Sequence, residues 1–172
     1  FTSIVRDGQG RKMSKSLGNS PDPLDLMDKF GADGLRFGLM RIAPTGTDIK
    51  FDEDTISEGR NFANKLYNAC RFRQMQGSGV IALDSFDTLD SHHVDILAKL
   101  DKLDENLDSA YENYRFNDVT GQLYEFFWTE YCDKFLEAIK FDFKSDDDSA
   151  AKARTLAVID IVLARFLAHL HP

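Results

Sequence analysis

Long apolar runs are missing from this sequence of 172 residues. No stretch approaches the roughly 20 consecutive apolar residues that a membrane-spanning helix requires, so a transmembrane protein is not expected. The opening run Phe1–Val5 is too short for a signal peptide, and charged residues follow it at once. Because the chain does not open on methionine and starts with a strand-like run, we expect it to be a piece of a longer protein.

Cysteine is also scarce. Cys70 and Cys132 are the two cysteines, and no spacing typical of a disulfide framework or a zinc motif surrounds them. They are best interpreted as two reduced thiols in a cytoplasmic protein. Four acidic side chains at helical spacing are interpreted as a solvated helix face: Asp101, Asp104, Glu105 and Asp108. The sequence therefore predicts no metal site.

Positive charge is in short supply, with 21 Lys and Arg against 29 Asp and Glu and a net charge of −8. This balance argues against indiscriminate binding to nucleic acid. The charges are unevenly distributed, because residues 1–76 carry 12 basic and 10 acidic side chains whereas residues 77–172 carry 9 and 19. Any contact with a polyanion is therefore expected in the first half of the chain.

Helical periodicity is abundant. A short strand, a polar loop, two short helices at 23–29 and 32–42 and a strand at 48–51 are predicted first. The rest is predicted to be four long amphipathic helices, at 54–76, 91–113, 117–140 and 147–169. Five aromatic residues of the third helix are predicted to be core: Tyr124, Phe127, Trp128, Tyr131 and Phe135. We predict a mainly α protein, with a small α/β segment over 1–53 and an α-helical bundle over 54–172.

The most informative stretch is the loop Lys12-Met13-Ser14-Lys15-Ser16-Leu17-Gly18-Asn19. The ammonium groups of Lys12 and Lys15 can both reach one phosphate chain, and Ser14 and Ser16 add hydroxyl donors. Such a loop can stabilise the negative charge that builds up on a leaving pyrophosphate. The same residues also suit a solvated, mildly basic surface loop.

A second candidate surface lies on the predicted helix 54–76. Its apolar stripe consists of Ile56, Ala63, Leu66 and Cys70, and one polar face carries Asn61, Asn64, Asn68 and Arg71 at i, i+3, i+7 and i+10. Asparagine is a poor helix former, so three on one face indicate a need for amide donors and acceptors. Asn can pair with adenine edges, and Arg can stack on bases or hold phosphate. A solvated face with local hydrogen bonds is the alternative.

The loop resembles a known family. Residues 12–16 are identical to the signature loop of the class I aminoacyl-tRNA synthetases, with matching context in Gly10-Arg11, Leu17-Gly18-Asn19 and Asp22-Pro23. The resemblance extends through residues 31–37, 48–51 and 60–72, and the last run is similar to the valyl-tRNA synthetases. Isoleucine and leucine relatives share the loop but usually differ at 61–65. Ser20-Pro21 departs from the aliphatic residues expected there and leaves the lysines untouched.

The resemblance implies a cytoplasmic, monomeric ligase that joins valine to tRNA(Val) with ATP, accompanied by Mg²⁺. In this family the amino-acid carboxylate attacks the α-phosphorus of ATP while loop lysines act on the phosphates. Lys15 matches the lysine with the main catalytic role and Lys12 the supporting one, and Ser14 and Ser16 complete the predicted ATP-binding set. The helix 54–76 is similar to the one that opens the anticodon-binding domain, which implies tRNA binding by Asn61, Asn64, Asn68 and Arg71.

Much of a class I active site is not in this sequence. Its four histidines, His92, His93, His169 and His171, do not form the His-x-Gly-His element that the family requires. We therefore expect a C-terminal fragment of an enzyme that is inactive alone, with the amino-acid pocket and any editing domain outside it. The rival interpretations are an isoleucyl or leucyl relative, and a purely structural acidic helical bundle.

Overall fold

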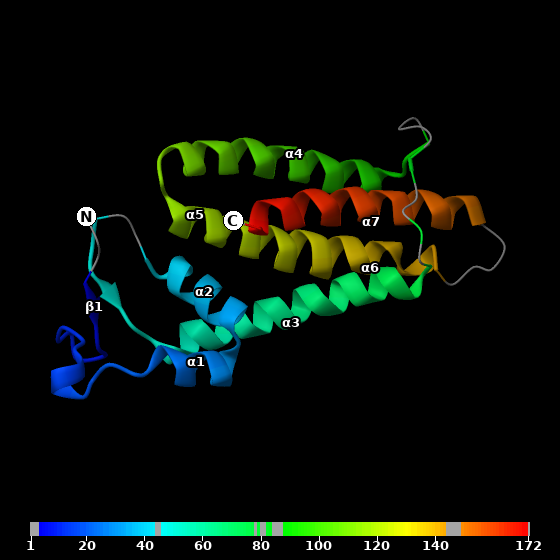
Figure 1. The fold of residues 1–172 in the computed structure, drawn as a ribbon. Helices are drawn as coiled ribbons and strands as arrows, with labels where there is room; N and C mark the ends of the chain where they lie inside the picture. Colours follow the sequence, from blue (N-terminus) through cyan, green and yellow to red (C-terminus); the bar gives the residue numbers. More distant parts are fainter. Residues whose placement is uncertain are drawn as a thin grey trace. The chain divides into compact units, whose positions relative to one another are not determined.

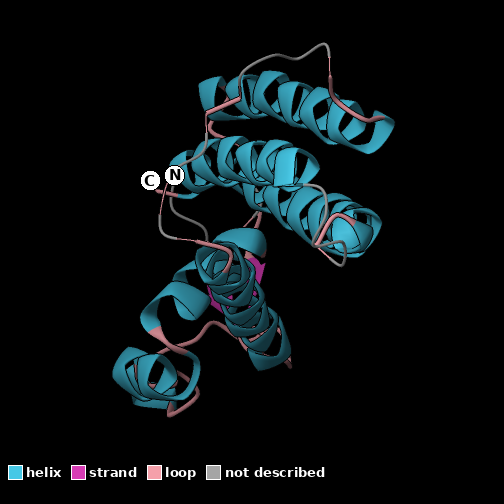
Figure 2. Ribbon diagram, turned by 90° about the vertical axis from the view of Figure 1, so that its right-hand side faces the viewer, coloured by secondary structure: helices cyan, strands magenta, loops and turns pink. Residues whose placement is uncertain are grey.

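The computed structural model describes residues 4–43, 46–77, 79, 82–83, 88–143 and 149–171. Contacts divide the chain into two compact units. Unit 1 comprises Phe1–Lys65 and Leu107–Gln122, and unit 2 comprises Leu66–Asn106 and Leu123–Pro172. Among the described residues, helices dominate both units and the strands form one short pair (Figure 2). The prediction of a mainly helical protein is confirmed.

Unit 1 begins with a parallel pair of two-residue strands, β1 (Val5–Arg6) and β2 (Ile49–Lys50), in which Val5 is opposite Ile49. Between the strands in sequence lie a short 3-10 helix, η1 (Lys15–Leu17), and the helices α1 (Pro23–Phe30) and α2 (Ala32–Arg41). The long helix α3 (Glu53–Met75) follows β2 (Figure 1). The helices and β2 agree with the sequence prediction to within one or two residues, whereas η1 lies in the predicted loop. Residues 1–3 of the predicted first strand lie outside the described residues.

Local chemistry explains where α1 begins and ends. The Asp22 side chain accepts a hydrogen bond from the Leu24 amide at 2.8 Å, and Pro23 occupies the first helical position. Gly31 ends the helix with a φ of 79°, in the left-handed region that glycine adopts without strain. Leu26, Phe30, Leu35 and Ile56 then form the buried core of this unit.

Glycines allow α2 and α3 to approach closely. A Cβ atom added at Gly59 of α3 would lie 2.3 Å from the carbonyl oxygen of Gly34 in α2. One added at Gly38 would lie 2.8 Å from the Cα atom of Ile56. Beside this crossing, the rings of Phe37 and Phe62 stack with centroids 4.4 Å apart. Residues with a side chain at these glycine positions would force the helices apart.

Unit 2 contains the end of α3, most of α4 (Ser91–Glu112), the helical segment from Leu123 onward, and α7 (Ser149–Leu170). The predicted helix 117–140 is a continuous helical segment whose winding changes along its length. It comprises α5 (Phe116–Glu125), a π-helix η2 (Phe126–Phe135), α6 (Leu136–Ala138) and a 3-10 turn η3 (Ile139–Phe141). The predicted start of the last helix, at residue 147, lies outside the described residues.

Aromatic residues fill the core of unit 2. Phe127 stacks on Phe166 with ring centroids 4.8 Å apart, and both side chains are fully buried. Tyr131 and Phe135 are buried as well, so the prediction of core aromatic residues is confirmed for these positions of the third helix. Tyr124 and Trp128 are only half-buried, and their rings stack at 5.3 Å.

Two features of unit 2 differ from the sequence interpretation. Arg73, on the buried side of α3, is 6% exposed and forms a bidentate ion pair with Asp160, with both N–O distances at 2.7 Å. Asp101 and Asp104 are not simply a solvated face. Arg165 forms ion pairs with both carboxylates. Asp104 Oδ1 also lies 2.8 Å from His169 Nε2, within hydrogen-bonding distance. Arg73 is tolerated in the interior because its charge is paired with Asp160 and its hydrogen-bond donors are satisfied.

None of the helices in the described part of the chain is both long enough and apolar enough to cross a bilayer.

Candidate functional site

The backbone of the lysine loop is attached to the strand pair of unit 1. Lys12 forms an antiparallel bridge with Arg6, and the Met13 amide donates to the Val5 carbonyl at 2.9 Å. Arg6 in turn donates from Nε to Asp48 at 2.5 Å and from a terminal nitrogen to the Gly10 carbonyl at 3.1 Å. Lys12 and Met13, at the start of the loop, are therefore fixed to β1.

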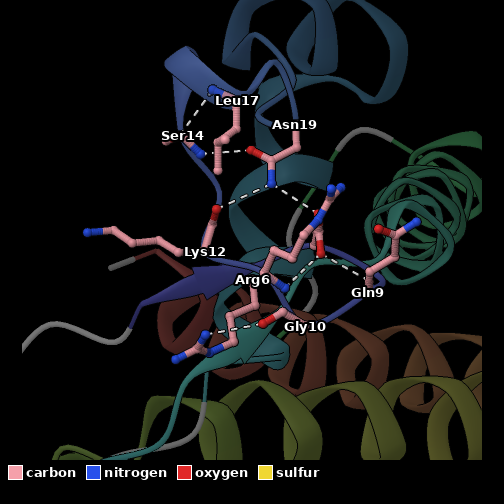
Figure 3. A network of polar contacts seen from close by, with 9 residues as sticks. Arg6, Gln9, Gly10, Lys12, Ser14, Leu17 and Asn19 are labelled. Carbon is pink, nitrogen blue, oxygen red and sulfur yellow. Dashed lines mark hydrogen bonds and ion pairs between the residues drawn. The ribbon is translucent and has the colours of Figure 1, made fainter.

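A hydrogen-bond network centred on Asp7 and Asn19 closes the loop (Figure 3). The Asn19 amide nitrogen donates to Asp7 Oδ2 at 3.0 Å and to the Lys12 carbonyl at 3.2 Å. Asn19 Oδ1 accepts from the Ser14 amide at 2.9 Å. The Asp7 carboxylate also accepts from the Arg11 backbone and side chain, each at 2.9 Å. The Asn19 bond, together with those from Arg11, holds the pKa of Asp7 well below its usual value.

The two loop serines are held together at the start of η1. Ser14 caps this short helix by accepting from the Leu17 amide at 3.3 Å, and its hydroxyl lies 3.1 Å from that of Ser16. Gly18 ends η1 with a φ of 63° and donates its amide to the Lys15 carbonyl. The structure thus brings Ser14 and Ser16 together, with Lys15 between them in sequence.

The two lysines extend from this closed loop toward solvent. Lys12 and Lys15 are both exposed, and neither ammonium group has an ion-pair partner within the part of the chain that the structure describes. Figure 3 shows the Lys12 side chain directed away from the Asp7–Asn19 network. Two unneutralised ammonium groups beside paired hydroxyls on a fixed loop form a surface suited to a polyphosphate.

The polar face predicted on α3 is exposed. Asn61, Asn64, Asn68 and Arg71 all have exposed side chains. The buried side of the helix is formed by Ile56, Gly59, Phe62, Ala69 and Arg73. The predicted apolar stripe was correct at Ile56, whereas Ala63, Leu66 and Cys70 are only half-buried. Phe62 and Ala69 take the buried places instead.

Arg60 is a member of this surface that the sequence analysis did not include. It stands one helical turn before Asn64 and is exposed, and its guanidinium donates to the Lys29 carbonyl at 2.8 Å. Arg60 and Asn64 together line one side of a cavity of about 370 Å³, whose other walls are the end of α1 and the start of α2. The i, i+4 spacing from Asn64 was the signal that could have identified Arg60.

Two family models match the chain in sequence order. The model described as "tRNA synthetases class I (I, L, M and V)" matches residues 1–52. The model described as "Anticodon-binding domain of tRNA ligase" matches residues 94–172.

Curated relatives match along nearly the whole chain. The valine–tRNA ligase of Nitratidesulfovibrio vulgaris is 44% identical over 172 residues, which covers 99% of this chain and 19% of the relative. That of Geobacter sulfurreducens is also 44% identical, over 174 residues, with the same coverage of both chains. That of Rhizobium meliloti is 42% identical and covers 99% of this chain and 18% of the relative. The chain thus spans about a fifth of the length of these relatives.

Solved structures share the fold. The methionyl-tRNA synthetase of Mycobacterium tuberculosis, in complex with methionyl-adenylate, superposes with a TM-score of 0.77 at 23% identity, over 98% of this chain and 34% of that one. The LeuRS–tRNA–LeuAMS ternary complex from Agrobacterium radiobacter gives a TM-score of 0.67 at 22% identity, over 98% and 21%.

Proposed function

The chain belongs to the class I aminoacyl-tRNA synthetases, and from that premise we propose that it forms the ATP loop and the anticodon-binding part of a valine–tRNA ligase. We propose valine as the amino acid because the chain is 44% identical to valine–tRNA ligases over 99% of its length. Within the longer protein, the proposed reaction joins valine to tRNA(Val) at the expense of ATP. The division into residues 1–53 and 54–172 is part of this proposal.

In the proposed reaction the lysine loop acts on ATP. Valine's carboxylate oxygen forms a bond to the α-phosphorus, the bond to the bridging oxygen breaks, and pyrophosphate leaves with the electron pair. Lys15 and Lys12 would neutralise charge that develops on the departing phosphates, and Ser14 and Ser16 would donate hydrogen bonds to them. The exposure of both ammonium groups and the 3.1 Å separation of the serine hydroxyls support these roles.

The proposal also includes the Mg²⁺ ion that accompanies ATP. Mg²⁺ prefers oxygen ligands and is commonly bound through the phosphates of its nucleotide. The loop's carboxylate, Asp7, is already occupied by Arg11 and Asn19. We propose that Mg²⁺ enters with ATP and is not held by this loop.

The exposed face of α3 is the proposed contact to tRNA. Asn61, Asn64, Asn68 and Arg71 offer amide and guanidinium groups on one side of a helix whose opposite side is buried. We add Arg60 to this set, because it lies one turn before Asn64 on the same face and lines the same cavity. The location of these residues in the more basic half of the chain favours an anionic partner.

The test of the proposal is the charging specificity of the full-length protein that contains this chain. Purified protein is incubated with ATP and one amino acid at a time, valine, isoleucine or leucine, together with the cognate tRNA of each. We expect aminoacylation of tRNA(Val) with valine, in a cytoplasmic and monomeric enzyme. Preferred charging with isoleucine or leucine would establish the rival relative, and no preference for any tRNA would establish a structural bundle.

A further inference from the structure

Two adjacent histidines of unit 2, which the proposed function does not use, lie among carboxylates at the start of α4. One ligand atom from each of Asp90, His92 and His93 lies within 4.8 Å of the other two. His93 is 1% exposed and His92 is half-buried, and their rings are 4.1 Å apart between centroids. We propose that these three residues bind a divalent transition metal of the Zn²⁺ class.

One carboxylate faces the same nitrogen of both rings. Asp142 Oδ2 lies 3.8 Å from His92 Nε2 and 4.0 Å from His93 Nε2. His93 Nε2 also lies 2.9 Å from the Thr155 hydroxyl, which donates to Asp142 at 2.6 Å. Since the Thr155 hydrogen goes to Asp142, His93 Nε2 carries a hydrogen and donates it to Thr155. The lone pair of His93 is therefore on Nδ1.

This arrangement is similar to the one that histidine ligands of metals usually have. A metal-binding histidine typically donates its second N–H to a carboxylate, directly or through another group, which fixes the tautomer and the ring orientation. Asp142 supplies that carboxylate to His93 through Thr155, and it lies close to His92 Nε2. We assign Nδ1 of each ring as a metal ligand, with Asp90 as the third and Asp142 as the orienting carboxylate.

The ligand atoms, which lie within 4.8 Å of one another, would have to draw closer together to hold a small ion. His93 Nδ1 is 3.7 Å from Asp90 Oδ2. Two ligands of a tetrahedral Zn²⁺ are roughly 3.3 Å apart, given metal–ligand bonds of about 2.0–2.2 Å. Asp90 is exposed and can move by this amount. Three protein ligands would leave the fourth position to water.

His92 Nε2 is the ring nitrogen that the proposal leaves for Asp142. His92 Nε2 is shielded from solvent and has no hydrogen-bond partner among the described residues. Buried polar atoms of this kind usually have a hydrogen-bond partner, and Asp142 Oδ2 lies 3.8 Å from this one. Metal binding at His92 Nδ1 would fix the ring and make Nε2–H a donor to Asp142.

The electrostatic surroundings also favour a cation. Asp90 and Asp142 contribute two negative charges, and Arg154 contributes one positive charge near His93. In the absence of metal, His93 Nδ1 accepts the Asp90 amide at 3.3 Å, which is a helix-capping contact that the metal would replace.

The experiment compares variants of the full-length protein after removal of metal with a chelator and addition of Zn²⁺ or Co²⁺. His92→Ala and Asp90→Asn are expected to bind one Zn²⁺ fewer per chain than the wild type and to lose one set of Co²⁺ visible d–d bands. His171→Ala changes an exposed histidine outside the cluster and should bind like the wild type. Asp142→Asn should weaken the affinity by about 10–100-fold, as loss of an orienting carboxylate does.

His92→Ala and Asp90→Asn decide the matter because neither side chain is fully buried, whereas loss of the His93 ring could unfold unit 2. Added Zn²⁺ should raise the melting temperature of the wild type and of His171→Ala but not that of the two decisive variants. Equal Zn²⁺ stoichiometry and an unchanged Co²⁺ spectrum in wild type, His92→Ala and Asp90→Asn would overturn the proposal and leave a helix-capping cluster only.

Discussion

Lys15 is the single residue on which the proposed chemistry depends most. In the full-length protein, Lys15→Ala should lower kcat and kcat/KM for adenylate formation together, because the charge acts mainly on the transition state. By analogy with loss of an oxyanion donor, the expected loss is about 2.7–4 kcal/mol, or roughly 10²–10³-fold. Lys12→Ala should cost less. The measurement is single-turnover adenylation with saturating valine.

Lys50→Ala is the matched control, because Lys50 is an exposed lysine on β2 outside the loop. It should leave the rate unchanged. A Lys15→Ala enzyme with the wild-type rate and only a raised KM for valine would contradict the assigned role.

Asp7 should determine how firmly the loop is closed. Asp7→Asn removes the charge that Arg11 and Asn19 bind, so amide hydrogen exchange at Met13–Asn19 should accelerate. Asp25→Asn, an exposed acid of α1, is the control. Because the folded pKa of Asp7 is lowered, its contribution is fully present above the unfolded value of about 3.9 and is lost only as the pH falls through the folded value.

Exchange at these amides should therefore show no loss of loop order at any pH above about 4, after correction for the intrinsic rate. Loosening of the wild-type loop between pH 7 and pH 5, or an Asp7→Asn loop as protected as the wild type, would show that other contacts hold it.

Single residues also show which features of the structure can be predicted from the sequence. The exposure of Lys12 and Lys15 followed from the prediction of a polar loop between a strand and a helix. The Asp7–Asn19 bond did not, because it joins side chains 12 positions apart in a loop without periodicity. Arg73 was missed for a related reason: its position on the buried side of α3 depends on Asp160, 87 positions away. Hydrophobic periodicity cannot reveal a buried charge whose partner is distant.

At the scale of elements, the crossing of α2 and α3 depends on Gly59. Gly59→Ala should destabilise the protein by about 1–3 kcal/mol, since its Cβ would lie 2.3 Å from the Gly34 carbonyl and overpacking displaces the backbone. Gly121→Ala in α5 is the control, because no atom lies within 4 Å of the added Cβ. It should stabilise by about 0.5–1 kcal/mol, as alanine does in a helix. Urea denaturation measures both, and a neutral Gly59→Ala would refute the close crossing.

The exposed face of α3 should distinguish base contacts from phosphate contacts. Valine anticodons share a central adenine, whose edge an asparagine amide can pair with. Asn64→Ala or Asn68→Ala in the full-length protein should cost roughly 1–3 kcal/mol of tRNA(Val) binding and reduce discrimination against another central base. Arg71→Ala should weaken all tRNAs evenly and lower the log–log salt slope by about one if it holds phosphate.

Filter binding of wild-type and anticodon-substituted tRNA(Val) at several salt concentrations measures these effects. Asp108→Ala is the control, because Asp108 is an exposed acid of α4, whereas Asp104 is ion-paired. If Asn64, Asn68 and Arg71 variants all bind both RNAs as the wild type does, the face is merely solvated.

The sequence predicted where the helices begin and end better than it predicted the type of helix. Helix periodicity placed α3 and α4 within one or two residues of their observed ends. It did not predict the π-helix Phe126–Phe135, in which the aromatic side chains Phe127, Tyr131 and Phe135 are buried at a spacing of four. A spacing of four fits both α and π winding, so the pattern alone does not choose between them.

At the scale of the whole chain, the distribution of charge separates two kinds of surface. Residues 77–172 carry 19 acidic and 9 basic side chains, and several of these form internal pairs such as Lys99 with Glu130 and Arg165 with Asp101. Residues 1–76 carry a small positive excess together with the lysine loop and the α3 face. The distribution of charge thus agrees with the proposal that anionic ligands are bound in the first half.

The last prediction separates the two proposed activities of the chain. The 172 residues lack the His-x-Gly-His element, and the chain corresponds to about a fifth of its relatives' length. We expect the isolated chain to show no valine-dependent ATP–pyrophosphate exchange, because a phosphate-binding loop without the amino-acid pocket cannot align the carboxylate with the α-phosphorus. Salt-dependent binding of tRNA(Val) should persist if the chain folds alone, which circular dichroism checks. The full-length protein is the positive control for exchange, and exchange above background in a contaminant-free preparation of the isolated chain would contradict this expectation.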